Sequence, residues 1–118
     1  MPTCDRFEVA VVPFPCVDVL AVKRRPALSL STATFLWANG HGVFAMITTA
    51  KRSAWPSDIP FRDWRGAGLT APSILRWKLF TLPEALVLGR LGRLTPFDAA
   101  AAERGLALLL GLDPPGRA

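Results

Sequence analysis

A chain of 118 residues has room for one hydrophobic core, so we expect a single domain over residues 1–118. Hydrophobic residues make up 51% of it, which excludes an intrinsically disordered protein. The formal net charge is +5, and arginine supplies most of the positive charge, since lysine occurs only at Lys23, Lys51 and Lys78. A basic, arginine-rich domain favours a polyanionic partner. A GC-rich genome, which encodes arginine in preference to lysine, would produce the same bias, so composition alone leaves the partner open.

The two cysteines, Cys4 and Cys16, exclude a disulfide framework and lack the spacing of a metal site. Free thiols are typical of a reducing cytoplasm, where we expect the protein to be. No apolar run reaches the ~18 residues that cross a bilayer, and the acidic residues Asp5 and Glu8 do not fit a signal peptide. We therefore expect no membrane partner. With one histidine and scattered carboxylates, we also expect no metal and no other cofactor.

The first half of the chain predicts strands, at Phe7–Val12, Ala27–Trp37 and Val43–Thr49. Prolines end the first strand, and Cys16–Val22 is expected to be a loop. The dipeptide Asn39-Gly40 is typical of a β-hairpin turn because it tolerates positive φ. We expect His41 to be a solvated residue of that turn.

The second half begins with a polar, aromatic segment. Residues Ala50–Gly68 predict a long functional loop, interrupted by a short strand at Ile59–Phe61. Ser73–Phe80 predicts a further strand that carries Arg76 and Lys78 on one face by the two-residue period. The segment Pro83–Leu94 fits a helix or a strand.

A helix closes the chain. Thr95 is its expected N-cap, Pro96 suits its first turn, Asp98 complements its dipole, and Gly111 is expected to end it. Its apolar stripe is expected to pack on the sheet and consists of Phe97, Leu106, Leu109 and Leu110. Many short strands with one terminal helix predict a mostly β domain, a small barrel.

The order and spacing of several blocks of residues resemble the PemK/MazF toxins. The blocks are Val11–Pro15 with Lys23–Leu28, Met46–Thr49, Asp58–Pro60 with Trp64, Gly68-Leu69 with Pro72–Arg76, and Lys78–Leu82 with Leu91–Leu94. Together they span about residues 7–110. The resemblance implies a small antiparallel SH3-like barrel with a C-terminal helix. It also implies the toxin component of a type II toxin–antitoxin system, a homodimer that cuts single-stranded RNA without a metal. A cognate antitoxin would silence it by inserting an extended peptide into the RNA groove.

The resemblance also implies catalytic residues. Arg25, in its Arg-Pro step, resembles the family's catalytic arginine and would clamp the scissile phosphate. Thr48 resembles the catalytic hydroxyl residue, and Thr49 could share that role. Arg76 aligns with a basic residue near the leaving group, where phosphate stabilisation is the expected role because arginine is a poor proton donor. An ordinary surface arginine and an ordinary strand threonine are the structural alternatives.

Further side chains are expected to bind RNA. They are Arg24, Thr49, Lys51, Arg52, Trp55 and Lys78. Cations beside an exposed tryptophan suit single-stranded RNA, whose bases stack on aromatic rings. The alternative role of a tryptophan here is packing in the loop or in a dimer interface.

The chain departs from the family pattern in two places. Certain relatives carry a candidate base two residues after the equivalent of Arg76, where this chain has Lys78; Asp58 and Asp63 are weak substitutes. Relatives often open with Gly-Asp, where this chain has Phe7-Glu8. Two rival functions stay open: a toxin of the same fold that poisons DNA gyrase, and an RNA- or peptide-binding module with a decayed catalytic site.

Overall fold

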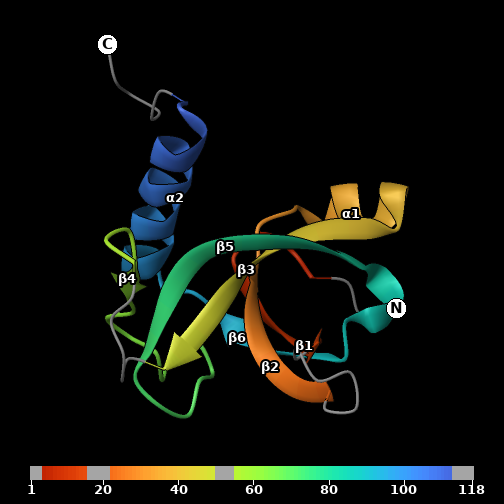
Figure 1. Ribbon diagram of the computed structural model, residues 1–118, viewed down its shortest axis with the longest axis horizontal. Helices are drawn as coiled ribbons and strands as arrows, with labels where there is room; N and C mark the ends of the chain where they lie inside the picture. Colours follow the sequence, from red (N-terminus) through yellow and green to blue (C-terminus); the bar gives the residue numbers. More distant parts are fainter. Residues whose placement is uncertain (1–3, 16–21, 50–54, 113–118) are drawn as a thin grey trace.

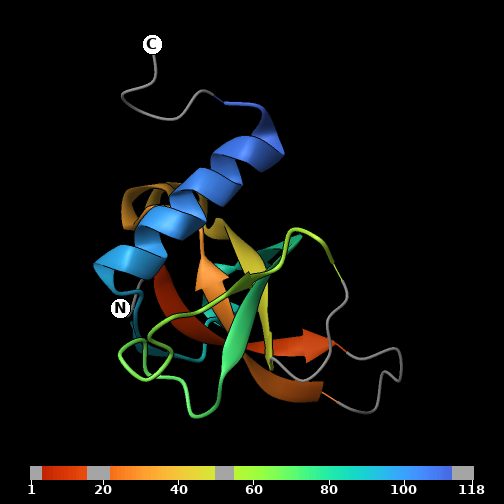
Figure 2. The same cartoon turned by 90° about the vertical axis from the view of Figure 1, so that its left-hand side faces the viewer.

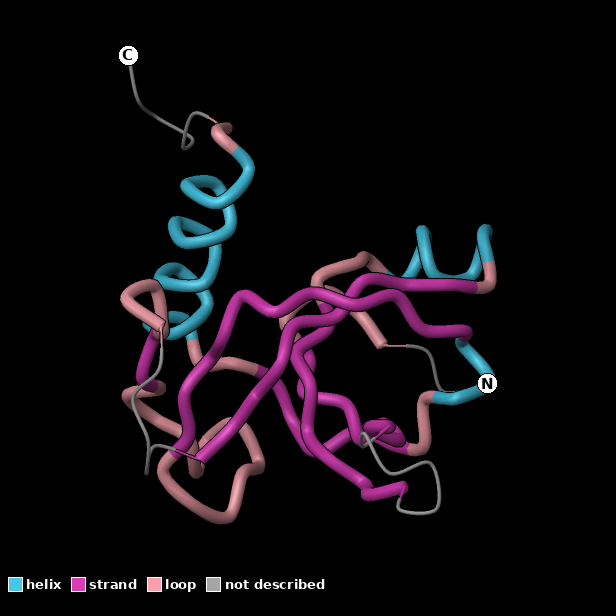
Figure 3. The backbone as a smooth tube through the Cα atoms, in the orientation of Figure 1, coloured by secondary structure: helices cyan, strands magenta, loops and turns pink. Residues whose placement is uncertain are grey.

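The computed structural model describes residues 4–15, 22–49 and 55–112 as a curled antiparallel sheet with a C-terminal helix (Figure 1). The sheet has six strands in the order β4-β5-β3-β2-β1-β6 and curls into a half-barrel (Figure 3). The predicted mostly β fold with a terminal helix is therefore confirmed. In chain order the elements are β1 (Glu8–Pro15), β2 (Val22–Ser29), α1 (Ala33–Asn39), β3 (His41–Thr49), β4 (Ile59–Pro60), β5 (Ser73–Pro83), the 3-10 turn η1 (Glu84–Leu86), β6 (Gly89–Arg93) and α2 (Pro96–Leu110).

Both faces of the sheet are buried, each against its own cluster of apolar side chains. Successive residues of one strand enter opposite clusters, as the period of two requires: Val9 and Ala10, Leu28 and Ala27, Ala45 and Phe44. The first cluster includes Ala102 of α2, and the second includes Leu36 of α1. Each helix thus covers one face, which explains why β1 is an almost continuous apolar run.

The predicted strand Ala27–Trp37 is wrong in its second half. The strand ends at Ser29, and Ala33–Asn39 forms α1. The Thr32 hydroxyl caps this helix by accepting the Phe35 N–H at 3.1 Å. Asn39-Gly40 ends the helix, since Gly40 has φ +71° and its N–H donates to the Leu36 carbonyl. A left-handed glycine serves a helix C-terminus as well as a hairpin turn, so the hairpin prediction was wrong. His41 begins β3 instead of lying in a turn.

The second half follows the prediction more closely. The short strand is β4, and the strand predicted at Ser73–Phe80 is β5, which continues to Pro83. The ambiguous segment Pro83–Leu94 contains both η1 and β6. Figures 1 and 3 show β3 and β5 as long neighbouring strands, bent along their length.

The helix α2 ends as predicted, at Gly111 with φ +70°, but its apolar stripe packs differently from the prediction. Only Leu106 of the stripe packs against the first cluster. Phe97, Leu109 and Leu110 are 55%, 46% and 56% exposed. Thr95 is the N-cap residue but makes no side-chain cap bond. The C-terminal end of α2 projects away from the sheet (Figures 1 and 2), which explains why leucines on its last turn stay in solvent.

The start of α2 is fixed by its one buried carboxylate. Asp98 is 2% exposed, and its two oxygens accept the backbone N–H groups of Arg62 and Asp63, both at 2.9 Å. Asp98 therefore ties the loop after β4 to the first turn of the helix. Further along α2, Gly105 lets Trp77 approach, because a Cβ there would lie 2.8 Å from the indole ring.

Two glycines of the family-like blocks meet across the fold. Gly68, at φ +86°, lies against the backbone of Leu91, and a Cβ on Gly92 would lie 2.5 Å from the Ala67 carbonyl oxygen. The loop that contains Gly68 can therefore contact β6 only because both glycines lack a side chain.

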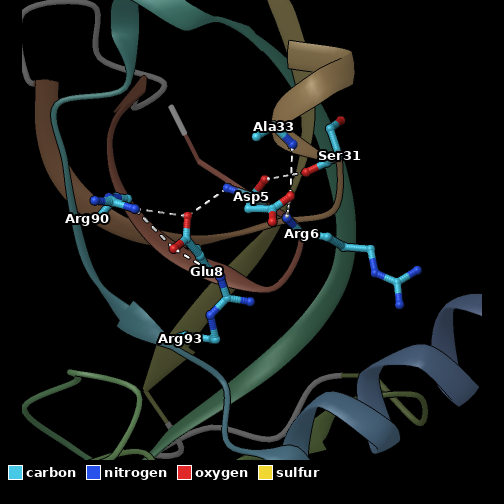
Figure 4. A network of polar contacts seen from close by, with 8 residues as sticks. Asp5, Arg6, Glu8, Ser31, Ala33, Arg90 and Arg93 are labelled. Carbon is cyan, nitrogen blue, oxygen red and sulfur yellow. Dashed lines mark hydrogen bonds and ion pairs between the residues drawn. The ribbon is translucent and has the colours of Figure 1, made fainter. Parts of the chain in front are cut away.

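Phe7 and Glu8 stand where relatives often have Gly-Asp, and they occupy a strained, polar corner. Phe7 has φ +68° although it carries a buried ring. Glu8 accepts the Asp5 N–H at 2.7 Å and pairs with the guanidinium groups of Arg90 and Arg93 (Figure 4). This corner joins the start of β1 to β6.

The same corner holds the start of α1. The Asp5 Oδ1 accepts the N–H groups of Ala33 and Arg6, both at 2.9 Å. These backbone hydrogen bonds, that of Ala33 first, hold the pKa of Asp5 below its usual value. An ionised Asp5 therefore stabilises the fold through the N-terminus of α1.

Gly92→Ala should lower the free energy of unfolding by about 1–3 kcal/mol, because the new methyl group must displace the backbone of Ala67. Urea unfolding followed by tryptophan fluorescence measures the loss. Gly89→Ala is the matched control on the same strand, since nothing lies within 4 Å of a Cβ there. Equal effects of the two substitutions would refute the role of the close approach.

Asp5→Asn should lower the free energy of unfolding at pH 7 by about 0.3–1 kcal/mol, since it removes a charge at a helix N-terminus and keeps an acceptor oxygen. A lowered pKa in the folded state means that the stabilisation is present above the unfolded pKa of about 4 and is lost as pH falls through the folded value. The gap between wild type and Asp5→Asn should therefore close below about pH 4. A gap that is the same at pH 7 and pH 3 in urea unfolding would contradict this.

Candidate active site

The three predicted catalytic residues come from adjacent strands and share one face of the sheet. Met46 of β3 pairs with Ala27 of β2 on one side and with Arg76 of β5 on the other, so these three form a cross-strand row. Thr48 lies two residues along β3 on the same face, opposite Ile74. Arg76 is therefore a diagonal neighbour of Thr48, a separation of about 7–8 Å that a long side chain spans.

Arg25 completes this arrangement from β2. It lies two residues before Ala27, on the same face, where β2 runs past the end of its ladder with β3. Pro26 follows within the strand, so the backbone at Arg25 is extended, as the Arg-Pro step predicts. Arg25 is half-buried, whereas its neighbour Arg24 is exposed. The sheet register alone thus brings Arg25 and Thr48 together.

A small cavity of about 150 Å³ opens between these residues. Its lining residues come from β2, β3, β5 and the loop before β5, and they are Arg25, Pro26, Ile47, Thr48, Thr49, Leu69, Thr70, Ala71 and Ser73. A guanidinium and two or more hydroxyl groups around one cavity form a set of hydrogen-bond donors that suits an anion such as a phosphate. No sequence pattern predicted that the loop residues Thr70 and Ala71 would lie here.

Arg76 is held by a carboxylate. Its Nε donates to Oδ1 of Asp58 at 3.1 Å and its Nη2 to Oδ2 at 2.8 Å. The side chains are 13% and 11% exposed, and the hydrogen bond to Asp58 raises the pKa of Arg76 above its usual value. The Trp55 ring lies 5.7 Å from the guanidinium carbon. Asp58 was considered above only as a weak candidate base, and its pairing with Arg76 was missed.

The remaining predicted residues surround this face in different ways. Thr49 and Lys78 are exposed, at the end of β3 and within β5, and Trp55 is 41% exposed. Trp77 and Lys78 lie in an irregularity of the ladder, since Leu79 pairs with Ala45 while Arg76 pairs with the next residue, Met46. Lys51 and Arg52 lie outside the described residues.

Two further candidates lie apart from the site or are committed elsewhere. Asp63 accepts the Gly66 N–H at 2.8 Å and so closes a turn. His41 begins β3, whereas Thr48 lies near the end of that strand. Seven residues of strand separate them by roughly 23 Å, too far for direct participation.

Within the described residues, His, Cys, Asp and Glu form no group of three or more that could hold a metal ion. In the same part of the chain, no helix is long and apolar enough to cross a membrane.

Residues 5–110 match the family model described as PemK-like, MazF-like toxin of type II toxin-antitoxin system. A search of curated proteins found no match. A chain of the MazE-MazF complex (Form-II) from Deinococcus radiodurans superposes with a TM-score of 0.74 at 19% identity, over 96% of this chain and 100% of that one. An endoribonuclease in complex with its cognate antitoxin, from a mycobacterial species, gives 0.73 at 20% identity, over 98% and 100%. The Mycobacterium tuberculosis toxin MazF-mt6 gives 0.70 at 21% identity, over 91% and 99%. These likenesses establish a shared fold.

Proposed function

The chain belongs to the family of PemK-like, MazF-like toxins of type II toxin–antitoxin systems, and from this premise we propose that it is an endoribonuclease that cuts single-stranded RNA. The observation that carries the proposal is the convergence of Arg25 and Thr48 on one cavity, with Arg76 as a diagonal neighbour. Two of these side chains are permanent cations and the third is a neutral donor. Such a set stabilises negative charge that develops on phosphate oxygens during RNA cleavage.

The proposed reaction uses the 2′-hydroxyl of the RNA as the nucleophile, because it is already held beside the phosphorus. Its oxygen bonds to phosphorus as its proton passes to solvent water, and the bond to the 5′-oxygen of the next nucleotide breaks as that oxygen takes a proton from water. The products are a 2′,3′-cyclic phosphate and a free 5′-hydroxyl. Arg25 clamps the non-bridging oxygens, Thr48 donates a hydrogen bond to one of them, and Arg76 stabilises charge near the leaving oxygen.

We propose that the RNA strand continues over the exposed polar side chains around this cavity. They are Arg24, Thr49, Lys51, Arg52, Trp55 and Lys78. Cations would contact phosphates, and the exposed face of Trp55 would stack on a base. The partial exposure of Trp55 and its closeness to the Arg76 guanidinium support this role.

We further propose that the protein acts as a homodimer that a cognate antitoxin silences. An apolar hollow of about 470 Å³, lined by residues that include Phe35, Val43, Leu79, Leu106 and Leu110, supports a second copy on this side of α2. An extended, acidic antitoxin segment would compete with RNA for the cations around Arg25. The mycobacterial endoribonuclease of similar fold is itself in complex with its cognate antitoxin.

The proposed mechanism is tested with a cleavable RNA and the same RNA carrying a single 2′-deoxy nucleotide 5′ to the cut. Cleavage of the unmodified RNA should persist in chelator, since the attacking group belongs to the substrate. The deoxy substrate should bind with little loss but should not be cut. Cutting of the deoxy substrate, or a 5′-phosphate on the product, would overturn the mechanism. The absence of any RNA cleavage would overturn the function and favour a gyrase poison or a binding module.

Arg25→Ala should lower kcat about 10²–10³-fold and abolish growth arrest, because it removes the cation that clamps the phosphate. Thr48→Ala should lower kcat only about tenfold, since a neutral hydrogen bond contributes less. Single-turnover cleavage assays and growth curves measure both effects. Arg6→Ala is the matched control, because it removes one positive charge from an exposed pair with Glu103. An Arg25→Ala variant that folds and still arrests growth would show that this assignment is wrong.

A further inference from the structure

The ion pair between Asp58 and Arg76 has a geometry that fixes the orientation of the guanidinium. Both contacts, Nε to Oδ1 and Nη2 to Oδ2, lie on one edge of the planar group. A two-point pairing of this kind sets the plane of the arginine as well as its position. The edge formed by Nη1 and Nη2 points elsewhere and has the donor spacing that a phosphate requires.

Asp58 is itself held by the backbone of the sheet and of a turn. Ile59 of β4 pairs with Leu75 of β5 in an antiparallel ladder. Asp58 precedes Ile59 and Arg76 follows Leu75, so Asp58 and Arg76 face each other. The Asp58 N–H donates to the Trp55 carbonyl at 3.0 Å, and the Trp55 N–H donates back to Oδ2 at 3.3 Å. The carboxylate is therefore positioned by main-chain contacts before it positions Arg76.

The row that begins with Asp58 leads directly to the proposed site. Asp58, immediately before β4, faces Arg76 of β5, and the row continues through Met46 of β3 to Ala27 of β2. Thr48 lies in the next row. We propose that Asp58 is a positioning residue for RNA cleavage, which holds Arg76 so that its outer edge meets the phosphate beside Thr48. This inference rests on the endoribonuclease activity proposed above. It assigns a role in that reaction to a carboxylate just before β4, whereas Lys78 lies on β5.

Two other roles for Asp58, a general base and an anion that competes with RNA, predict different results. As a general base it would have to take a proton from the RNA, but both of its oxygens already accept hydrogen bonds from the Arg76 guanidinium. As a competing anion it would block RNA from Arg76, and its removal would raise affinity and activity. A positioning role predicts instead that removing the charge lowers kcat, leaves KM nearly unchanged, and acts only through Arg76.

The test compares Asp58→Asn, Arg76→Ala and the double variant of the full chain, on an RNA with one cleavage site mapped for the wild type. Asp58→Asn should lower kcat about 10–100-fold, since small displacements of a catalytic group have effects of this size. In the Arg76→Ala background the same substitution should have no further effect. Asp58→Glu, which keeps the charge, should restore part of the activity. Glu103→Gln, which breaks an exposed pair at 3.1 Å, is the matched control and should leave kcat unchanged.

An equal loss on adding Asp58→Asn to Arg76→Ala would overturn the inference, because Asp58 would then act independently of Arg76. A rise in activity of Asp58→Asn would overturn it in favour of the competing anion. If Asp58→Asn does not fold, Arg76→Lys is the variant to measure, because it keeps the positive charge and loses the two-point pairing. Its kcat should fall to a similar extent. A kcat equal to that of the wild type would overturn the inference. A wild-type chain that cuts no RNA overturns the proposed function and this inference together, whereas cleavage without coupling between the two residues overturns the inference alone.

Discussion

The antiparallel register of β3 with its two neighbours is the constraint on which the rest of the structure depends. This register decides which side chains of β3 enter the two apolar clusters and which remain partly exposed at one end of the sheet. A shift by one residue would exchange Ile47 with Thr48 and would bury a hydroxyl while exposing a core side chain. Core packing therefore fixes the register, and the register fixes the site. No separate stabilisation of the site residues is required to bring them together.

The candidate site occupies the part of one sheet face that the second apolar cluster does not reach. Ala27 and Phe44 belong to that cluster, whereas Arg25, two residues before Ala27, and Thr48, four residues after Phe44, are only half-buried. Polar groups at that position keep enough contact with water to avoid the cost of full burial. They are still attached to strands whose other ends are locked in the core. This combination gives a rigid backbone beneath side chains that can bind an anion.

The sequence predicted what depends on local pattern and missed what depends on tertiary contact. The fold class, the strand β5 and the end of α2 at Gly111 follow from periodicity and breaker residues. Asn39-Gly40 misled because the same left-handed glycine suits a hairpin and a helix end, and only the Thr32 cap separates the two. The family resemblance named Arg25, Thr48 and Arg76, but no local pattern links Asp58 to Arg76, 18 residues away. The pairing of β4 with β5 brings the two residues together, and a strand of two residues is too short for its sequence pattern to predict that pairing.

The two arginines of the candidate site differ in whether a carboxylate holds the guanidinium group. Among the described residues, four arginines pair with carboxylates, and Arg76 is one of them while Arg25 is not. A paired guanidinium loses little conformational entropy when a phosphate arrives, because Asp58 has already fixed its plane. An unpaired guanidinium loses more, but it offers its full charge to the ligand. A site with one arginine of each kind combines a fixed direction of approach with a strong local attraction, and both would suit the flexible, polyanionic RNA strand that we propose as the substrate.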